Sequence, residues 1–357
     1  MRPKFCSAEN GYRLEWITMC PGCGSGPGGN ATLSLSDIFA KDSERAYKWN
    51  ASICGSCKTC FLNPRPTADT IGSAYAHYYT HSTADSENLA VRRSGLLRLV
   101  RRIRESYTRL RVSARPKYRD LILGFFAFLH PGKRKLVDIG LRYAFRCRSK
   151  SERPSRILDV GAGDGAFISL FSSLGWDCFA VEPDRSSAVY RFLSPDRICD
   201  SIHEVHPELN CSFDMVTFSH VLEHIHHPLE ALKRSASLLR NGGGLWIDVP
   251  NPHSKLAGIF GSYWRGYEAP RHLVLFDKDR LLDILLELGF AHIDVIRRPD
   301  VFDFMRVRSN EILLQQMSGH KEVMSVSTQA LNAASALRGR DRDAEFLTIF
   351  ARKTVTY

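Results

Sequence analysis

The sequence predicts an α/β protein whose main domain is a doubly wound sheet preceded by two smaller regions. From residue 156 onward, short β-rich runs alternate regularly with helical segments, as in sheets covered by helices on both faces. A glycine-rich loop at 158–165 joins one such strand to the helix after it. Two cysteine clusters and a basic stretch come first. We therefore expect a cysteine-rich module at 15–67, a basic helical linker or lid at 68–155, and the α/β domain at 156–357.

Length and composition indicate a soluble, cytoplasmic protein. A chain of 357 residues with 44% hydrophobic content is long enough for roughly two domains. Its first residues build no apolar signal segment, and the longest apolar run, at 121–129, is about half of what a bilayer requires. The chain has ten cysteines, and in a reducing compartment the clustered ones favour metal binding over disulfides.

Positive charge is concentrated in one segment. Residues 89–156 contain 20 Lys/Arg against 4 Asp/Glu, which gives this segment a net charge of +16. The net charge of the whole chain is +11, so the rest of the chain has a net charge of −5. Such asymmetry indicates a local anionic partner. Nothing in the composition indicates an oligomeric state.

Two helices are predicted within this basic segment. In "LLRLVRRIRESYTRLRV", apolar residues recur every three or four positions, at Leu96, Val100, Ile103, Tyr107 and Leu110, which is typical of an amphipathic helix. A second, apolar helix should run from 118 to 129 and stop at "HPG". Two interpretations remain open: lid helices with solvated arginines, or a surface resting on an anionic membrane at about 1 kcal/mol per basic residue.

The α/β domain is expected to follow a regular order. Helices should cover "GAFISLFSSLG", the segment after "DRSSA", "PLEALKRSASLLRNGGG" ended by its glycines, and "KDRLLDILLELGF". Residues 308–345 should form a helix plus a loop. The predicted strands are "RILDV", "DCFAVEP", a short "RIC", "SFDMVTFS", "LWIDVP", "AHIDVI" and "FLTIFARK".

The loop "LDVGAGDG" has the context of a ligand-binding loop, because it follows a strand and opens a helix. Asp159 and Asp164 would repel a pyrophosphate but favour a sulfonium or an ammonium group. Glu182, 23 residues after Asp159, ends the next strand, where a carboxylate suits hydrogen bonds to both hydroxyls of a ribose. The set disfavours a plain tight turn with chance acidic residues.

These residues resemble class I S-adenosylmethionine-dependent methyltransferases. "SFDMVTFSHVLEHIHHP" and "LRNGGGLWIDVPN" are similar to the fourth- and fifth-strand segments of the ubiquinone-methylase-like branch. "YWRGYEAPRHLVLFD" resembles the W-x-G-x-x-x-P-R-H-L-x-x-F signature of a bacterial subgroup associated with surface polysaccharides and natural products. The resemblance implies a Rossmann-like, seven-stranded sheet, S-adenosylmethionine as cofactor, and methylation, chiefly at oxygen, of a small molecule or glycan.

The resemblance also implies roles for residues. Asp159, Gly161 and Gly163 would contact the methionine part of the cofactor, and Glu182 would bind its ribose. Asp200 and Ser201 would lie beside the adenine. Ser219 and His220 would lie close to the methyl group that is transferred.

A hydroxyl acceptor needs a base, and histidine suits this role because its pKa lies near working pH. His272, in the "PRHL" loop where this fold commonly builds its acceptor pocket, is the first candidate, and His220 is the second. A divalent cation bound by His220, Glu223 and His224 is an alternative interpretation of the same segment.

Three further residues are candidates for binding the acceptor. Tyr263 and Trp264 would stack on a sugar or aromatic ring, although Trp264 equally suits a core position. Arg271 either orients an anionic or hydroxylated acceptor or serves as a structural ion-pair partner.

The cysteine spacing alone leaves open whether Cys54 and Cys57, or Cys57 and Cys60, form the second ligand pair. The exit sequence "FLNPRPT" aligns with the subgroup pattern C-x-x-C-G-L-x-F-L-N-P-R-P-T. The resemblance then implies a structural zinc ribbon with four thiolates, from Cys20, Cys23, Cys54 and Cys57, and leaves Cys60 as a small apolar residue.

Two other classes of function are weighed against methylation of a small molecule or glycan. One is a binding or regulatory protein that acts through the cysteine module and basic helices. The other is a nucleic-acid methyltransferase, which we disfavour: "SHVLEH" stands where a D/N-P-P-Y/F motif would lie, no cysteine nucleophile follows a proline, and the basic stretch lacks aromatic platforms.

Overall fold

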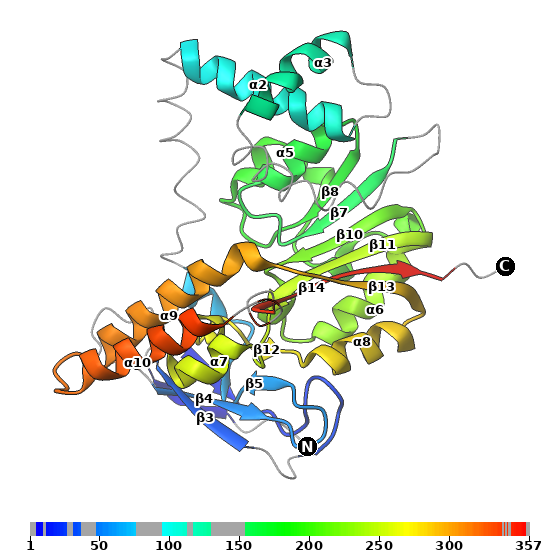
Figure 1. Ribbon diagram of the computed structural model, residues 1–357. Coiled ribbons are helices and arrows are strands. Elements are labelled where there is room, and N and C mark those ends of the chain that lie inside the picture. The colour runs from blue at the N-terminus through cyan, green and yellow to red at the C-terminus, as the bar shows by residue number, and fades with distance from the viewer. Residues whose placement is uncertain are drawn as a thin grey trace. The chain divides into compact units, whose positions relative to one another are not determined.

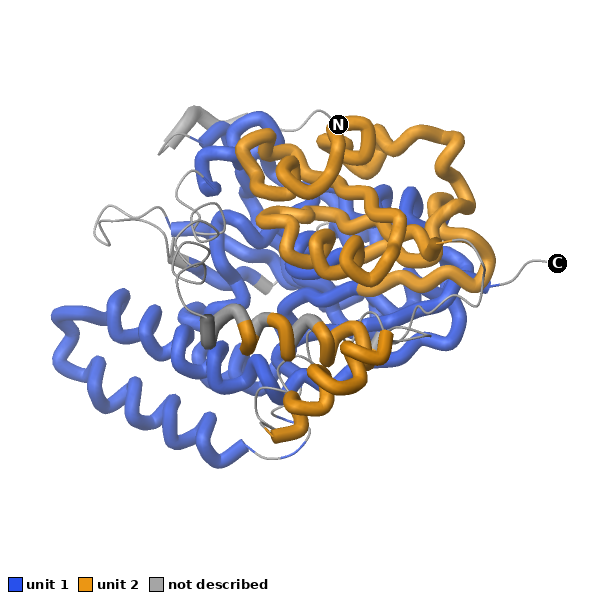
Figure 2. Tube along the Cα trace, turned by 90° about the horizontal axis from the view of Figure 1, so that it is seen from above, with its two compact units in different colours: residues 1–78, 218–236, 247–354 blue, residues 79–217, 237–246, 355–357 orange. Residues whose placement is uncertain are grey.

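The computed structural model describes residues 5–9, 12–26, 31–36, 48–75, 95–112, 117–129, 154–337, 339, 341 and 344–354. The chain forms two compact units (Figure 2). Unit 1 contains residues 1–78, 218–236 and 247–354, and unit 2 contains 79–217, 237–246 and 355–357. Much of the basic region, including the predicted "HPG" stop, lies outside the described residues. No helix in the described ranges has the length and apolarity needed to cross a membrane.

A seven-stranded sheet confirms the predicted Rossmann-like α/β class (Figure 1). Its order, β13-β14-β11-β10-β7-β8-β9, is not sequential and therefore requires crossovers. Strand β8 is parallel to both β7 and β9, whereas β13 and β14 are antiparallel. The strands are β7 (Arg156–Val160), β8 (Asp177–Val181), β9 (Ile198–Cys199), β10 (Phe213–Ser219), β11 (Leu239–Pro250), β13 (Phe290–Ile296) and β14 (Phe346–Lys353).

In unit 2, the two predicted basic helices are present as α2 (Gly95–Val112) and α3 (Tyr118–Phe125), the latter continued by a 3-10 turn, Phe126–Leu129. They pack closely at Gly124, where a Cβ atom would lie 3.2 Å from the backbone of Ser106 and Tyr107. Arg109 Nε donates to Asp120 Oδ1 at 3.0 Å. The helix after the glycine loop is α5 (Ala166–Ser173).

Unit 1 holds two small sheets besides its share of the large one. One has the order β1-β2-β6, with β1 (Phe5–Glu9), β2 (Tyr12–Glu15) and β6 (Arg65–Pro66). The other has the order β12-β5-β4-β3, with β3 (Ala31–Ser36), β4 (Lys48–Ile53), β5 (Cys60–Leu62) and β12 (Val274–Leu275). The cysteine-rich segment thus pairs with a strand from the carboxyl-terminal half.

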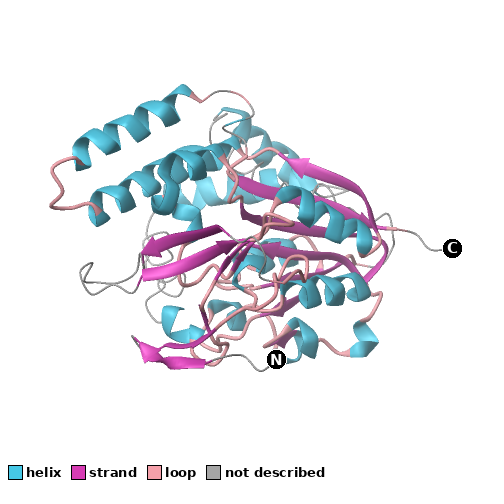
Figure 3. Ribbon diagram, turned by 90° about the horizontal axis from the view of Figure 1, so that it is seen from below, coloured by secondary structure: helices cyan, strands magenta, loops and turns pink. Residues whose placement is uncertain are grey.

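The helices of unit 1 include a long pair, α9 (Phe302–Gln316) and α10 (Val323–Ala336), which lie side by side (Figure 3). The predicted single helix plus loop over 308–345 is therefore two helices. The remaining helices are α6 (Pro228–Leu238), α7 (Lys255–Phe260) and α8 (Lys278–Glu287).

Two local predictions differ from the structure. Helix α6 ends at Leu238 and β11 begins at Leu239, so the glycines belong to the strand and do not end the helix. A Cβ at Gly243 would lie 3.1 Å from the carbonyl oxygen of Phe213, which explains a glycine there. The helix expected after "DRSSA" is only a 3-10 turn, Ala188–Arg191.

Candidate functional site

The glycine loop joins β7 to α5 in unit 2 and adopts left-handed backbone at three glycines. The φ angles of Gly161, Gly163 and Gly165 are 73°, 50° and 70°, values that glycine tolerates and other residues rarely adopt. A Cβ at Gly165 would meet the Phe192 ring at 2.6 Å, so this glycine serves packing. At Gly163 the nearest such atom is 3.9 Å away. This second glycine therefore leaves room for a ligand beside the backbone.

Glu182 follows β8 and lies against the glycine loop. The carboxylate is buried, with Oε2 accepting from Gly163 N at 2.8 Å and Oε1 accepting from Asp184 N at 3.0 Å. Each carboxylate oxygen has a second lone pair. The side chain is thus held in place while keeping the capacity to accept hydroxyl protons.

Asp159 is buried at the end of β7, next to the loop. Thr217 Oγ1 donates to its Oδ1 at 2.6 Å. Burial raises the pKa of Asp159 to about 7, and the negative charges of Glu182 and Asp164 act in the same direction. A cation close to this carboxyl group would be stabilised by it. Thr217 cannot be recognised from the sequence, since a threonine within a buried strand carries no motif signal.

Asp200 and Ser201 follow the short strand β9. Arg185 Nη2 pairs with Asp200 Oδ2 at 2.7 Å, while the buried Oδ1 of Asp200 has no hydrogen-bond partner among the described residues. Ser201 Oγ accepts from His203 N at 3.3 Å.

Ser219 and His220 end β10 and belong to unit 1. His220 has a φ of 59°, which is uncommon for a residue with a side chain and is often associated with functional sites. Its backbone N donates to Asp248 O at 2.8 Å. Thr348 and Arg298 in turn hold the Asp248 carboxylate. The His220 side chain is 50% exposed.

His272 lies in unit 1 and is enclosed, with its side chain 6% exposed. Its Nδ1 lies 2.6 Å from Gly266 O, so Nδ1 carries the proton because a carbonyl oxygen can only accept. Its Nε2 lies 3.6 Å from Glu268 Oε2 and 4.0 Å from Glu223 Oε1. Burial lowers the pKa of His272 to about 3, so the imidazole is neutral at working pH. Glu268, which could not be recognised from the sequence, forms ion pairs with Arg265 and Arg271 beside this histidine.

The three predicted acceptor-binding residues occupy different environments. Trp264 is buried and its Nε1 donates to Glu345 Oε2 at 3.3 Å, an arrangement that anchors it in the core. Arg271 is buried as well, with Nη2 2.8 Å from Glu268 Oε1, which favours the structural ion-pair interpretation. Tyr263 is partly exposed.

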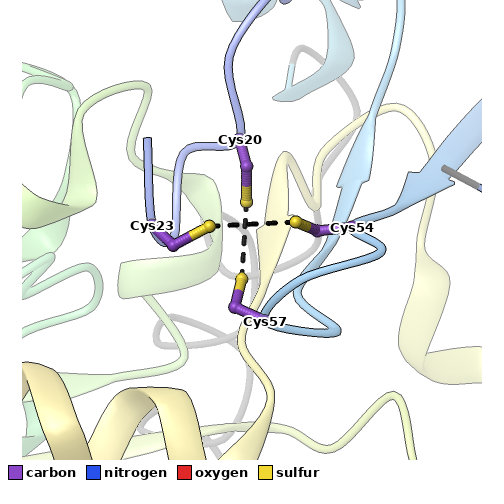
Figure 4. A group of neighbouring side chains, drawn as sticks. All are labelled: Cys20, Cys23, Cys54 and Cys57. Atoms are coloured by element: carbon purple, nitrogen blue, oxygen red, sulfur yellow. Dashed lines mark hydrogen bonds between the residues drawn. The ribbon is translucent and has the colours of Figure 1, made fainter. Parts of the chain in front are cut away.

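The four cysteines selected from the sequence converge in unit 1 (Figure 4). The Sγ atoms of Cys20 and Cys57 are 3.5 Å apart, and those of Cys23 and Cys54 are 3.8 Å apart. All four are free thiols. Cys60 instead lies buried in β5, opposite Leu275 of β12.

The sheet and the glycine loop with its neighbouring acidic residue define a class I S-adenosylmethionine-dependent methyltransferase fold. Residues 126–295 match a family model described as a methyltransferase domain.

Two curated relatives and one solved structure are similar to parts of this chain. The ubiquinone biosynthesis O-methyltransferase of Xanthomonas campestris is 32% identical over 104 residues, covering 27% of this chain and 44% of the relative. The Bradyrhizobium diazoefficiens protein of the same name is 26% identical over 158 residues, covering 38% and 62%. The chain thus spans about half the length of these relatives. A structure of an S-adenosylmethionine-dependent methyltransferase from Archaeoglobus fulgidus gives a TM-score of 0.40 at 21% identity, over 64% of this chain and 99% of that one.

Proposed function

We propose that this protein transfers a methyl group from S-adenosylmethionine to a hydroxyl oxygen of a small molecule or glycan. The observation that carries the proposal is the glycine loop, in which Gly163 leaves open space beside a buried, fixed Glu182. Oxygen as the acceptor atom is supported by the relatives, which are named O-methyltransferases. A glycan or natural-product sugar is supported by the W-x-G-x-x-x-P-R-H-L-x-x-F signature.

The chain's residues would bind the cofactor and accept a proton. The bound cofactor supplies an already activated methyl group on its sulfonium. Asp159 would stabilise that positive charge, Glu182 would bind the ribose hydroxyls, and Asp200 and Ser201 would contact the adenine. One of the two candidate histidines, His220 or His272, would take the proton of the acceptor's hydroxyl group.

Of the two candidate bases, His220 is the better supported. Its side chain is half exposed, whereas His272 is enclosed and has a pKa of about 3. A base with so low a pKa has little tendency to hold the proton. The assignment of His272 stays an untested prediction, which a comparison of His220→Gln and His272→Gln turnover would address.

Calorimetric titration with S-adenosylmethionine tests the proposed function. We expect one site, and Glu182→Gln should weaken binding about tenfold, as loss of a charged hydrogen-bond acceptor predicts. Glu208→Gln, whose side chain is 87% exposed, is the matched control and should bind normally. Failure to bind the cofactor, or binding unaffected by Glu182→Gln, would refute the proposal. The acceptor is then sought as a metabolite or glycan that gains one CH₂ unit only when the protein is present.

The cysteine cluster is proposed to hold a structural zinc ion. A tetrahedral site with Zn–S bonds of about 2.3 Å has sulfurs about 3.8 Å apart, which the observed separations of 3.5 and 3.8 Å approach. With four thiolates no coordination position stays open for chemistry. The ion would therefore stabilise the fold and take no part in methyl transfer.

The helices α2 and α3 are proposed to rest on an anionic membrane at the cytoplasmic face. Support comes from exposed apolar side chains, including Tyr118, Phe125 and Leu129 at 77%, 66% and 67%. Arg102, Arg111, Lys117 and Arg119 are also exposed on these helices. Apolar and basic side chains together are typical of interfacial helices. A lipid-linked glycan as acceptor would be consistent with this placement.

A further inference from the structure

Three side chains in unit 1 form a second cluster of metal-binding groups. Glu223, His224 and His272, here called the Glu–His cluster, each offer one ligand atom, and these atoms all lie within 4.8 Å of one another. The cluster contains no cysteine and comes from two chain segments. Glu223 and His224 lie in a 3-10 turn after β10 (Leu222–His224), and His272 precedes β12. The Glu–His cluster therefore shares no residue with the four-cysteine site.

The environment of the Glu223 carboxylate indicates that this cluster binds a ligand. The Glu223 side chain is completely buried, and neither carboxylate oxygen has a hydrogen-bond partner among the described residues. Leaving a buried polar group without a hydrogen-bond partner destabilises the folded protein, and more so if the group is charged. A bound cation would satisfy this carboxylate.

The two histidines are oriented as metal ligands usually are. His224 Nδ1 lies 3.0 Å from Arg271 O, and His272 Nδ1 lies 2.6 Å from Gly266 O. Because a backbone carbonyl only accepts, both Nδ1 atoms carry protons and both Nε2 atoms present lone pairs. Metal-binding histidines typically donate their other ring N–H to such a carbonyl or carboxylate. The two rings have their centroids 4.7 Å apart.

We propose that the Glu–His cluster binds one divalent transition-metal cation through the Glu223 carboxylate and the Nε2 atoms of His224 and His272. Two imidazoles and one carboxylate suit Zn²⁺, Fe²⁺, Co²⁺ or Mn²⁺. Ligands at about 2.1 Å in tetrahedral geometry lie about 3.4 Å apart, so the cluster has to contract from its present separation of 4.0 Å between Glu223 Oε1 and His272 Nε2.

A three-ligand set leaves a coordination position open. The open position would face His220, whose Nδ1 lies 4.0 Å from Glu223 Oε1. The side chain of His220 is 50% exposed, whereas that of Glu223 is 0% exposed. A water molecule or a hydroxyl oxygen of an acceptor is the class of ligand that this position would take. Metal binding itself does not depend on methyl transfer, so it is testable even if the proposed function fails.

Cobalt binding to the full-length protein distinguishes the two sites. After metal removal and reloading with Co²⁺, we expect two ions per chain. One should give the intense thiolate-to-cobalt absorption of the cysteine site, and the other only weak visible bands. Glu223→Gln and His224→Gln should each lower the Co²⁺ affinity of the second site about 100-fold or more, since replacing even an outer-shell partner costs 10–100-fold.

Controls make the outcome decisive. His227→Gln, an exposed neighbour outside the cluster, should retain two ions. Persistence of the thiolate absorption shows that each variant still folds in unit 1. Binding of only one Co²⁺ with thiolate character by the wild-type protein would overturn the proposal, and so would two ions in Glu223→Gln. If the variants do not fold, the wild-type stoichiometry alone decides.

Discussion

At the scale of single residues, the side chains and backbone of the W-x-G-x-x-x-P-R-H-L segment fix the position of His272. Gly266 lies against the indole of Trp264, so closely that a Cβ would come within 2.4 Å of its ring atoms. The carbonyl of Gly266 then accepts from His272 Nδ1. Trp264 is itself fixed by Glu345. The tryptophan, the glycine and the histidine of the signature are therefore linked by direct contacts.

A pH dependence of cofactor binding follows from Asp159. Its pKa is raised to about 7, so the side chain is largely neutral below pH 7 and ionised above it. A positively charged cofactor binds the ionised form better, so affinity should fall as pH drops below 7, by up to about tenfold per unit. Above that value it should level off. Calorimetry across this range measures the effect, and an Asp159→Asn variant that kept the same slope would contradict it.

Sequence reasoning succeeded where a residue's role is set by its neighbours in the chain. Glu182 could be placed next to the glycine loop because parallel strands end at the same edge of a sheet. Thr217 and Glu268 could not be found this way. Their significance arises from burial and from partners distant in sequence, such as Asp159 for Thr217 at 58 positions.

At the scale of elements, helix periodicity located α2 and α3 but not the environment of their faces. Val100 belongs to the predicted apolar stripe of α2 yet is 40% exposed, while Tyr107 is buried. In α3, Gly124 allows close packing on α2, and most of the apolar side chains stay exposed. Apolar periodicity indicates a face that avoids water, without specifying whether protein or lipid covers it.

Membrane binding by α3 is testable with vesicles. Phe125→Ser combined with Leu129→Ser should reduce partitioning onto anionic phosphatidylserine vesicles by about tenfold or more, since burying each large apolar side chain contributes about 1.5–3 kcal/mol. Phe304→Ser in α9, where the side chain is 50% exposed, is the matched control. Equal cosedimentation of all three proteins, or binding to neutral vesicles alone, would show that this surface has another role.

At the scale of the whole molecule, the cysteine module is built into unit 1. Leu62 N donates to the carbonyl oxygen of Leu273, the residue that follows His272, at 3.0 Å. Arg280 Nε donates to Gly22 O at 2.8 Å, and Arg65 Nη1 donates to His226 O at 3.0 Å. These contacts join segments about 160 to 260 positions apart, and no local sequence pattern could have predicted them.

Metal content provides a test of the cysteine assignment. Cys54→Ser should lose the thiolate-bound zinc, because the remaining three thiols cannot complete a closed site. Structural zinc can contribute about 10 kcal/mol or more, so unfolding should also occur at lower temperature. Cys60→Ser should keep its zinc, because Cys60 lies in β5 and outside the cluster that the other four thiols form. The reverse result, measured by elemental analysis, would assign Cys57 and Cys60 as the second pair.

The pairing of β5 with β12 has a consequence for any shortened form of the protein. A fragment beginning at residue 156 would retain every predicted element of the methyltransferase domain. It would nevertheless leave Val274 and Leu275 without the strand that Cys60 and Phe61 provide. Unpaired, apolar strand edges attach to other chains. Strand β5 thus covers this edge of β12, and a fragment that begins at residue 156 is expected to aggregate when expressed without it.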